Sequence, residues 1–286
     1  MINEYVLPKT VEEALDALTQ ENARIIAGGT DLLLDLQDGK KSPVVLVDVT
    51  GIDKIKDLKE VEGMITIGAA VTHQQITESG LIQEKAAVLA EASGTVGSLQ
   101  IRNTATLAGN VVNAQPAADG AVALIALGAE AVVKDKHGSR TEWVENLYAG
   151  LNSSKVDSTS QILTEIKFPP LAINQGSAYI RWAKREALAL PMLCVGVVIS
   201  MDGDRVEWAR IAMAPVATQP LRALDAEDVL KGQVPTKEVI LQAAEAAVKA
   251  ANPRDSKIRG SKVCRTSVLK NLVNRGIVKA LENAGR

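Results

Sequence analysis

The chain has 286 residues, of which 47% are hydrophobic and 23% are charged, and its formal net charge is −2 at pH 7. This length suffices for one large or two medium domains, and the lack of a long apolar segment excludes a membrane-spanning helix. With no basic run and only three Trp, three Tyr and one Phe, the composition gives no support to a nucleic-acid partner.

The first residues, MINEYVLP, carry neither a basic region nor an apolar secretion signal, so we expect a cytoplasmic protein. Thr10 lies three residues before Glu13, a spacing that predicts a capping box at the start of a helix. Apolar residues at helical spacing then share one face of that helix: Val11, Ala14, Leu15 and Leu18.

A pair of glycines follows the first apolar strand. The strand ends in Gly28-Gly29, and Thr30-Asp31 then opens an apolar, helix-like stretch at 32–37. Glycines let the backbone approach a bulky anion, and the first amides of a helix are free to hydrogen-bond it. A purely structural turn would have the same pattern. Together with the extended segment 44–49, the order predicts a β–α–β unit with parallel strands over residues 1–53.

A second block of strands and helices ends at Pro169-Pro170, the clearest boundary in the chain. Its predicted elements are a strand at 64–69, helices from about 72, at 85–93 and at 117–127, a hairpin of 129–133 and 140–144, and a strand at 162–168. The stretch 104–113 contains too many polar turn formers for a simple helix.

Beyond the two prolines the pattern predicts an antiparallel sheet covered by helices. The strands are expected at 177–183, 193–201 and 206–215, and the helices at 226–231, 237–251 and 266–283. Asp202-Gly203 joins the last two strands and is a strong signal for a hairpin.

Two glycine-rich turns could act together. The second turn, Thr106–Asn110, is followed nine residues later by Asp119. Neither turn has the glycine spacing of a dinucleotide-binding Rossmann fold or the lysine of a P-loop. Facing turns could hold a pyrophosphate through backbone amides, with the hydroxyls of Thr30 and Thr106 as additional donors, while Asn110 and Asp119 could bind ribityl or ring atoms. The alternative is that the glycines serve the turns alone, with Asp119 at a helix N-terminus facing the dipole.

Metal binding by this chain is not expected. The two cysteines, Cys194 and Cys264, cannot ligate an iron–sulfur cluster or a structural zinc unaided, and Cys194 lies in an apolar run typical of a buried side chain. The two histidines, His73 and His137, stand far apart in the sequence.

Three ordered motifs resemble the FAD-binding medium subunit of the molybdenum hydroxylases: Ile26–Leu32, Gln100–Asn110 and Pro116–Asp119. That family includes the flavin subunits of carbon monoxide dehydrogenase, nicotinate dehydrogenase and bacterial xanthine dehydrogenase. The resemblance covers nearly the whole chain. It implies an α+β fold, in which a two-part FAD-binding domain of the vanillyl-alcohol-oxidase-like (PCMH) type spans residues 1–170, divided at about 53, and a small α+β C-terminal domain with an antiparallel sheet and helices spans 174–286.

The resemblance also implies the residues that bind FAD. They are Arg24, Ile25, Ile26, Ala27, Gly28, Gly29, Thr30 and Asp31 in the first segment, Thr106, Leu107, Ala108, Gly109, Asn110 and Val112 in the second, and Asp119, Leu163 and Arg181 beyond them. No catalytic residue or metal ligand is implied. The family usually has glycine where this chain has Ala108, and lysine where it has Arg181. Glu186–Leu190 also departs from the acidic or aromatic pattern of relatives, which leaves the electron acceptor open.

By this resemblance, a partner large subunit oxidises the substrate at a molybdopterin centre. Electrons then cross iron–sulfur clusters on a small subunit, reach FAD on this chain, and leave to NAD or another acceptor. The implied substrate class is a purine or another N-heterocycle, with xanthine dehydrogenase as the preferred member. Two rival interpretations are a self-contained flavin oxidase of the vanillyl-alcohol-oxidase-like group and a nucleotide-binding scaffold without redox activity.

Overall fold

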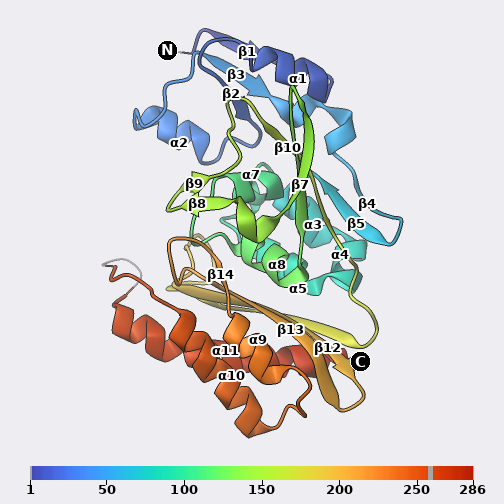
Figure 1. Cartoon of the computed structure of the whole chain (residues 1–286). Helices are drawn as coiled ribbons and strands as arrows, with labels where there is room; N and C mark the ends of the chain where they lie inside the picture. The colour runs from blue at the N-terminus through green and yellow to red at the C-terminus, as the bar shows by residue number, and fades with distance from the viewer. Residues whose placement is uncertain (1, 257–259, 286) are drawn as a thin grey trace.

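The structure, a computed structural model, describes residues 2–256 and 260–285. The chain builds three units in succession: a small parallel sheet, a five-stranded antiparallel sheet with helices, and a four-stranded antiparallel sheet with helices (Figure 1). This mixture of helices and antiparallel sheets agrees with the expected α+β fold.

The N-terminal unit is the β–α–β arrangement that the sequence predicts. Strand β3 lies between β1 and β2 and pairs in parallel with both. Thr10 caps α1 by accepting the Glu13 amide, but the Glu13 carboxylate accepts the Lys9 amide, so the predicted capping box forms only in part. The elements are β1 (Glu4–Val6), α1 (Val11–Ala17), β2 (Ala23–Ile26), α2 (Leu32–Gln37) and β3 (Val45–Asp48).

The second unit has the strand order β4-β5-β10-β6-β7, with every neighbouring pair antiparallel. Its strands are β4 (Leu58–Val61), β5 (Met64–Gly68), β6 (Glu130–Asp135), β7 (Gly138–Trp143) and β10 (Ile162–Phe168), and β8 (Tyr148–Gly150) pairs with β9 (Ser153–Ser154). Its helices are α3 (His73–Glu78), α4 (Gly80–Lys85), α5 (Ala87–Gly94), α6 (Leu99–Arg102), α7 (Leu107–Val112) and α8 (Asp119–Leu127).

One prediction in this unit was wrong. The stretch 104–113, not expected to form a simple helix, contains α7, because Thr106 and Asn113 cap a short helix at its two ends. The second glycine-rich turn is therefore the start of a helix. The helix expected at about 85–93 is present as α5, which is separated from α4 by Ala86 with φ −156°.

The third unit confirms the predicted antiparallel sheet, and Asp202 pairs with Arg205 at the predicted hairpin. The order is β11-β12-β13-β14. Its elements are β11 (Gln175–Trp182), β12 (Leu193–Asp202), β13 (Arg205–Ala214), β14 (Leu221–Arg222), α9 (Leu224–Leu230), α10 (Lys237–Ala250) and α11 (Lys262–Ala284).

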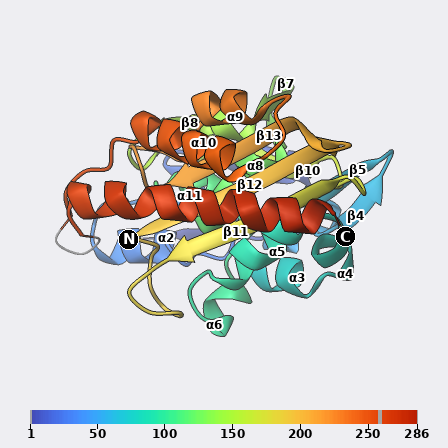
Figure 2. The same cartoon turned by 90° about the horizontal axis from the view of Figure 1, so that it is seen from below.

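The last sheet lies between two layers of helices. Helices α9, α10 and α11 cover one face, and α8 and α5 lie behind it (Figure 2). Every residue of α8 is buried, as expected for a helix enclosed by β12 and β13 on one side and by α5 and α7 on others. Gly196 on β12 allows this contact, because a Cβ there would lie 3.2 Å from the Val122 carbonyl oxygen. The core around α8 therefore includes buried side chains of the C-terminal sheet, such as Val198 and Ala212.

Among the described residues, no helix is long and apolar enough to cross a membrane. The same part of the chain has no group of three or more His, Cys, Asp or Glu that could hold a metal ion.

Candidate functional site

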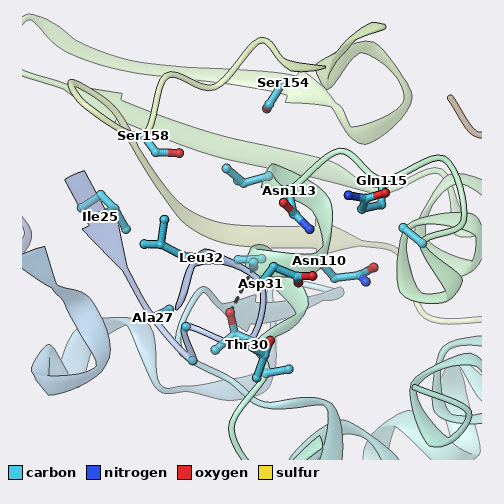
Figure 3. Close-up of a pocket in the computed structure, with 18 of the residues that line it drawn as sticks. Ile25, Ala27, Thr30, Asp31, Leu32, Asn110, Asn113, Gln115, Ser154 and Ser158 are labelled. Carbon is cyan, nitrogen blue, oxygen red and sulfur yellow. Dashed lines mark hydrogen bonds between the residues drawn. The ribbon is translucent and has the colours of Figure 1, made fainter. Parts of the chain in front are cut away.

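A cavity of about 660 Å³ lies between the small parallel unit and the rest of the molecule. Figure 3 shows that its walls come from segments far apart in the sequence, namely the loop after β2, the helix α7 and the segment before β10. Of the residues implied to bind FAD, all except Leu107 and Arg181 line this cavity. A volume of this size is within the usual range of roughly 300–1,000 Å³ for ligand and cofactor pockets.

The loop from β2 to α2 presents unpaired amides. Within residues 2–256 and 260–285, the amides at 28–32 donate no hydrogen bond, although the Gly29 carbonyl accepts from Leu33. Unpaired backbone donors beside a cavity require a ligand or water. Gly29 has φ +67°, which favours glycine. This combination of a glycine turn and free donors suits an anion.

Gly28 has a second role that the sequence did not reveal. A Cβ on this residue would collide with the Thr104 carbonyl and lie 3.0 Å from the Ala105 Cα. The two glycine-containing segments are therefore in close backbone contact at Gly28, beside the cavity that both line.

The first turn of α7 forms the opposite wall. The Thr106 hydroxyl oxygen accepts the Gly109 amide at 3.0 Å, so its own proton stays available to a ligand. The Asn110 side-chain oxygen accepts the Ala121 amide at 3.3 Å, which leaves the amide nitrogen to donate. Ala108 lies within the helix, where φ is negative, and its methyl group is tolerated there.

A polar segment that was not predicted from the sequence closes the cavity before β10. It contributes Asn152, Ser153, Ser154, Asp157, Ser158 and Gln161 to the lining, beside the predicted Leu163. The segment is fixed to β2 because the Ile25 amide donates to the Ser158 carbonyl at 2.9 Å. Its dense run of small polar residues was the available signal, but such runs are also typical of exposed loops.

Asp119 lies at the start of α8 and lines the cavity, although only 5% of its surface is exposed. Its Oδ1 accepts from the Tyr179 hydroxyl at 2.5 Å and from the Arg181 Nε at 3.1 Å. Arg181 therefore lies behind Asp119, outside the lining. It also donates to the carbonyl of Ala189, which itself lines the cavity.

Burial dominates the electrostatics of the site. It raises the pKa of Asp119, while the hydrogen bond from Tyr179 and the charge of Arg181 oppose that shift. Burial likewise raises the pKa of Asp31, with Asp35 adding to the shift and Lys41 opposing it.

His73 is a buried group beside the cavity that no function accounts for. Burial, followed by the charge of Arg102, lowers its pKa to about 4, so the imidazole is neutral at pH 7. Its Nδ1 lies 3.3 Å from the Ser93 hydroxyl, and its Nε2 has no hydrogen-bond partner among the described residues.

Comparison with known proteins decides the family. The family described as "FAD binding domain in molybdopterin dehydrogenase" matches residues 1–171, and "CO dehydrogenase flavoprotein C-terminal domain" matches residues 178–280. This chain belongs to the FAD-binding subunits of the molybdenum hydroxylases. The expected resemblance is thus confirmed over both parts of the chain.

Individual relatives agree with this assignment. The chain is 31% identical to the nicotinate dehydrogenase FAD-subunit of Eubacterium barkeri, covering 83% of this chain and 82% of the relative. It is 28% identical to the carbon monoxide dehydrogenase medium chain of Hydrogenophaga pseudoflava (96% and 95% covered) and 25% identical to the xanthine dehydrogenase FAD-binding subunit of Escherichia coli O157:H7 (98% and 97% covered). A solved structure of the Hydrogenophaga carbon monoxide dehydrogenase matches with a TM-score of 0.94 and 28% identity, covering 99% of this chain and 98% of that chain.

Proposed function

We propose that FAD occupies the 660 Å³ cavity, with its diphosphate between the loop 27–31 and the first turn of α7. The run of unpaired amides at 28–32 carries this proposal, because five adjacent donors without partners suit an anionic group. The Thr106 proton supplies a further donor from the opposite wall, and the Thr30 hydroxyl can supply another.

The remaining lining residues orient the two ends of the cofactor. The Asn110 amide nitrogen and the Asp119 carboxylate would hold ribityl or ring polar atoms, and Leu163 forms part of the apolar wall. Neither Leu107 nor Arg181 lines the cavity, and Arg181 supports Asp119 from behind through its hydrogen bond to Oδ1. We also propose domains at 1–170, in two parts divided near residue 53, and at 174–286, in keeping with the family matches to 1–171 and 178–280.

In this proposal the chain works in a complex with an iron–sulfur small subunit and a molybdopterin large subunit. When bound, FAD would supply the redox chemistry that links the clusters to NAD or another acceptor. This chain fixes the position of the cofactor, sets the charge around it and limits its contact with water. The names of the relatives, which are medium chains and FAD subunits, support this division of work.

The substrate class proposed for the complex is an N-heterocycle, with xanthine as the first compound to test. The nicotinate and xanthine dehydrogenase relatives support an N-heterocycle, whereas the carbon monoxide dehydrogenase relative is at least as similar as the xanthine one. Assays of the assembled complex with xanthine, nicotinate and carbon monoxide, each with NAD and with an artificial acceptor, separate these possibilities.

The first experiment is a visible spectrum of the purified full chain after incubation with FAD. The expected result is a yellow protein that holds one FAD per chain. A colourless protein that binds adenine nucleotides but no flavin would overturn the proposal and favour the non-redox scaffold. Oxidation of a small substrate by the chain alone would instead favour a self-contained oxidase.

A further inference from the structure

Two side chains of the C-terminal sheet hydrogen-bond a residue that lines the cavity. Tyr179 and Arg181 are two residues apart on β11, so both side chains leave the same face of the strand. That face meets the first residue of α8, Asp119. Tyr179 and Asp119 are only 6% and 5% exposed, which places their contact away from bulk water.

Both donors converge on a single oxygen of the carboxylate. The Tyr179 hydroxyl and the Arg181 Nε donate to Oδ1 of Asp119 at 2.5 Å and 3.1 Å. In the described part of the chain, no side chain donates a hydrogen bond to the second oxygen, Oδ2. A carboxylate held by two donors on one oxygen cannot rotate freely, so its second oxygen keeps a fixed direction.

Only Asp119 of these three residues lines the cavity. Tyr179 and Arg181 lie behind it, and Arg181 is itself held by the Ala189 carbonyl. Burial raises the pKa of Tyr179 well above its ordinary value, and neighbouring Cys194 and Asp119 add to the shift, so the hydroxyl keeps its proton and acts as a donor. The hydroxyl thus favours the charged form of Asp119, which burial alone would disfavour.

We propose that Tyr179 is a positioning residue for the cofactor, which acts by holding the Asp119 carboxylate so that its free oxygen points at FAD. This inference rests on the proposed function of the cavity. The C-terminal domain then contributes to the FAD site without contacting the cofactor, because the Tyr179 hydroxyl hydrogen-bonds Asp119, which lines the cavity.

The test uses the full chain and compares Tyr179→Phe with Tyr148→Phe. Each variant removes one buried hydroxyl and keeps the ring, but the Tyr148 hydroxyl has no partner among the described residues and does not line the cavity. Because a hydrogen bond to a charged group is lost, Tyr179→Phe should weaken FAD affinity about tenfold. It should also shift the reduction potential of the bound flavin to more positive values, since Asp119 becomes easier to protonate. Tyr148→Phe should change neither quantity.

A second comparison asks whether Tyr179 acts through Asp119. In an Asp119→Asn background, Tyr179→Phe should add little further loss of FAD affinity, because the group that it positions is already changed. Arg181→Gln removes the other donor to Oδ1 and serves as an independent variant. It should likewise add little further loss of FAD affinity in the Asp119→Asn background. Two results would overturn this inference without affecting the proposed function: fully additive losses of FAD affinity in the double variant, or wild-type FAD affinity and reduction potential in Tyr179→Phe. A wild-type chain that takes up no FAD would overturn the proposed function instead.

Discussion

At the scale of single residues, the buried histidine makes stability depend on pH. The pKa of His73 is about 4 in the folded chain, against an ordinary value of 6.5 for histidine. Above pH 6.5 the imidazole is neutral in both states. Below that pH the unfolded chain binds a proton that the folded chain does not, so folding stability falls as the pH drops from 6.5 toward 4.

This dependence gives a prediction with a matched control. Between pH 7 and pH 4.5, the wild type should lose roughly 2–3 kcal/mol more free energy of unfolding than His73→Phe, as one pKa unit corresponds to about 1.4 kcal/mol. Urea titrations at the two pH values measure the free energy of unfolding of each protein. Only the change in this free energy between the two pH values is compared. His137→Gln alters the other histidine, which is exposed, and should follow the wild type. Parallel curves for the wild type and His73→Phe would contradict the prediction.

A second prediction for a single residue concerns the close contact at Gly28. A Cβ at this position meets the Thr104 carbonyl, so Gly28→Ala should force the two cavity walls apart. We expect FAD affinity to fall at least tenfold, with stability lowered by about 1–3 kcal/mol as in other overpacked contacts. Gly80→Ala is the control, because a Cβ there has nothing within 4 Å. Fluorescence titration with FAD checks it, and equal affinity in the two variants would contradict the expected role.

At the scale of elements, regular periodicity was sufficient for most of the fold. The β–α–β unit, the hairpin around Asp202 and the long terminal helices followed from apolar spacing and turn residues. Short elements were missed or misassigned, including α6 and α7, because one or two turns give no periodic pattern. The lining residues at 152–161 were missed for another reason: their place depends on a backbone contact with β2, far away in the sequence.

A prediction for a single helix concerns Thr106, the N-cap of α7. Thr106 caps this helix and lines the cavity, whereas Thr236 caps α10 and lies outside the lining. Thr106→Ala and Thr236→Ala should each lower stability by about 1 kcal/mol, the usual effect of losing such a cap. Only Thr106→Ala should also weaken FAD binding. Denaturant titration and FAD titration of both variants measure the two effects. A loss of FAD affinity in both variants would argue against a direct contact between Thr106 and FAD.

At the scale of the whole molecule, the two family domains share the core around α8, while the C-terminal domain has a second core of its own. Helix α8 comes from the first domain, yet β12 and β13 of the second pack against it. Further contacts join the domains, because Glu91 on α5 accepts the Tyr179 amide at 3.1 Å and pairs with Lys279 on α11 at 2.7 Å. We therefore expect the position of α8, and with it that of Asp119, to depend on how closely the C-terminal sheet packs.

Two glycine variants separate this effect from simple destabilisation. In Gly196→Ala the new Cβ lies 3.2 Å from the Val122 carbonyl oxygen, so α8 must shift by a few tenths of an ångström. In Gly176→Ala the new Cβ meets the Ala280 carbonyl on α11 instead, on the face of the sheet away from the cavity. Both should lower the melting temperature, but only Gly196→Ala should weaken FAD affinity, by a few-fold, in protein that is still folded at the assay temperature. Wild-type affinity in Gly196→Ala would mean that α8 absorbs the shift without moving Asp119, and that the sheet supports the site only by keeping the chain folded.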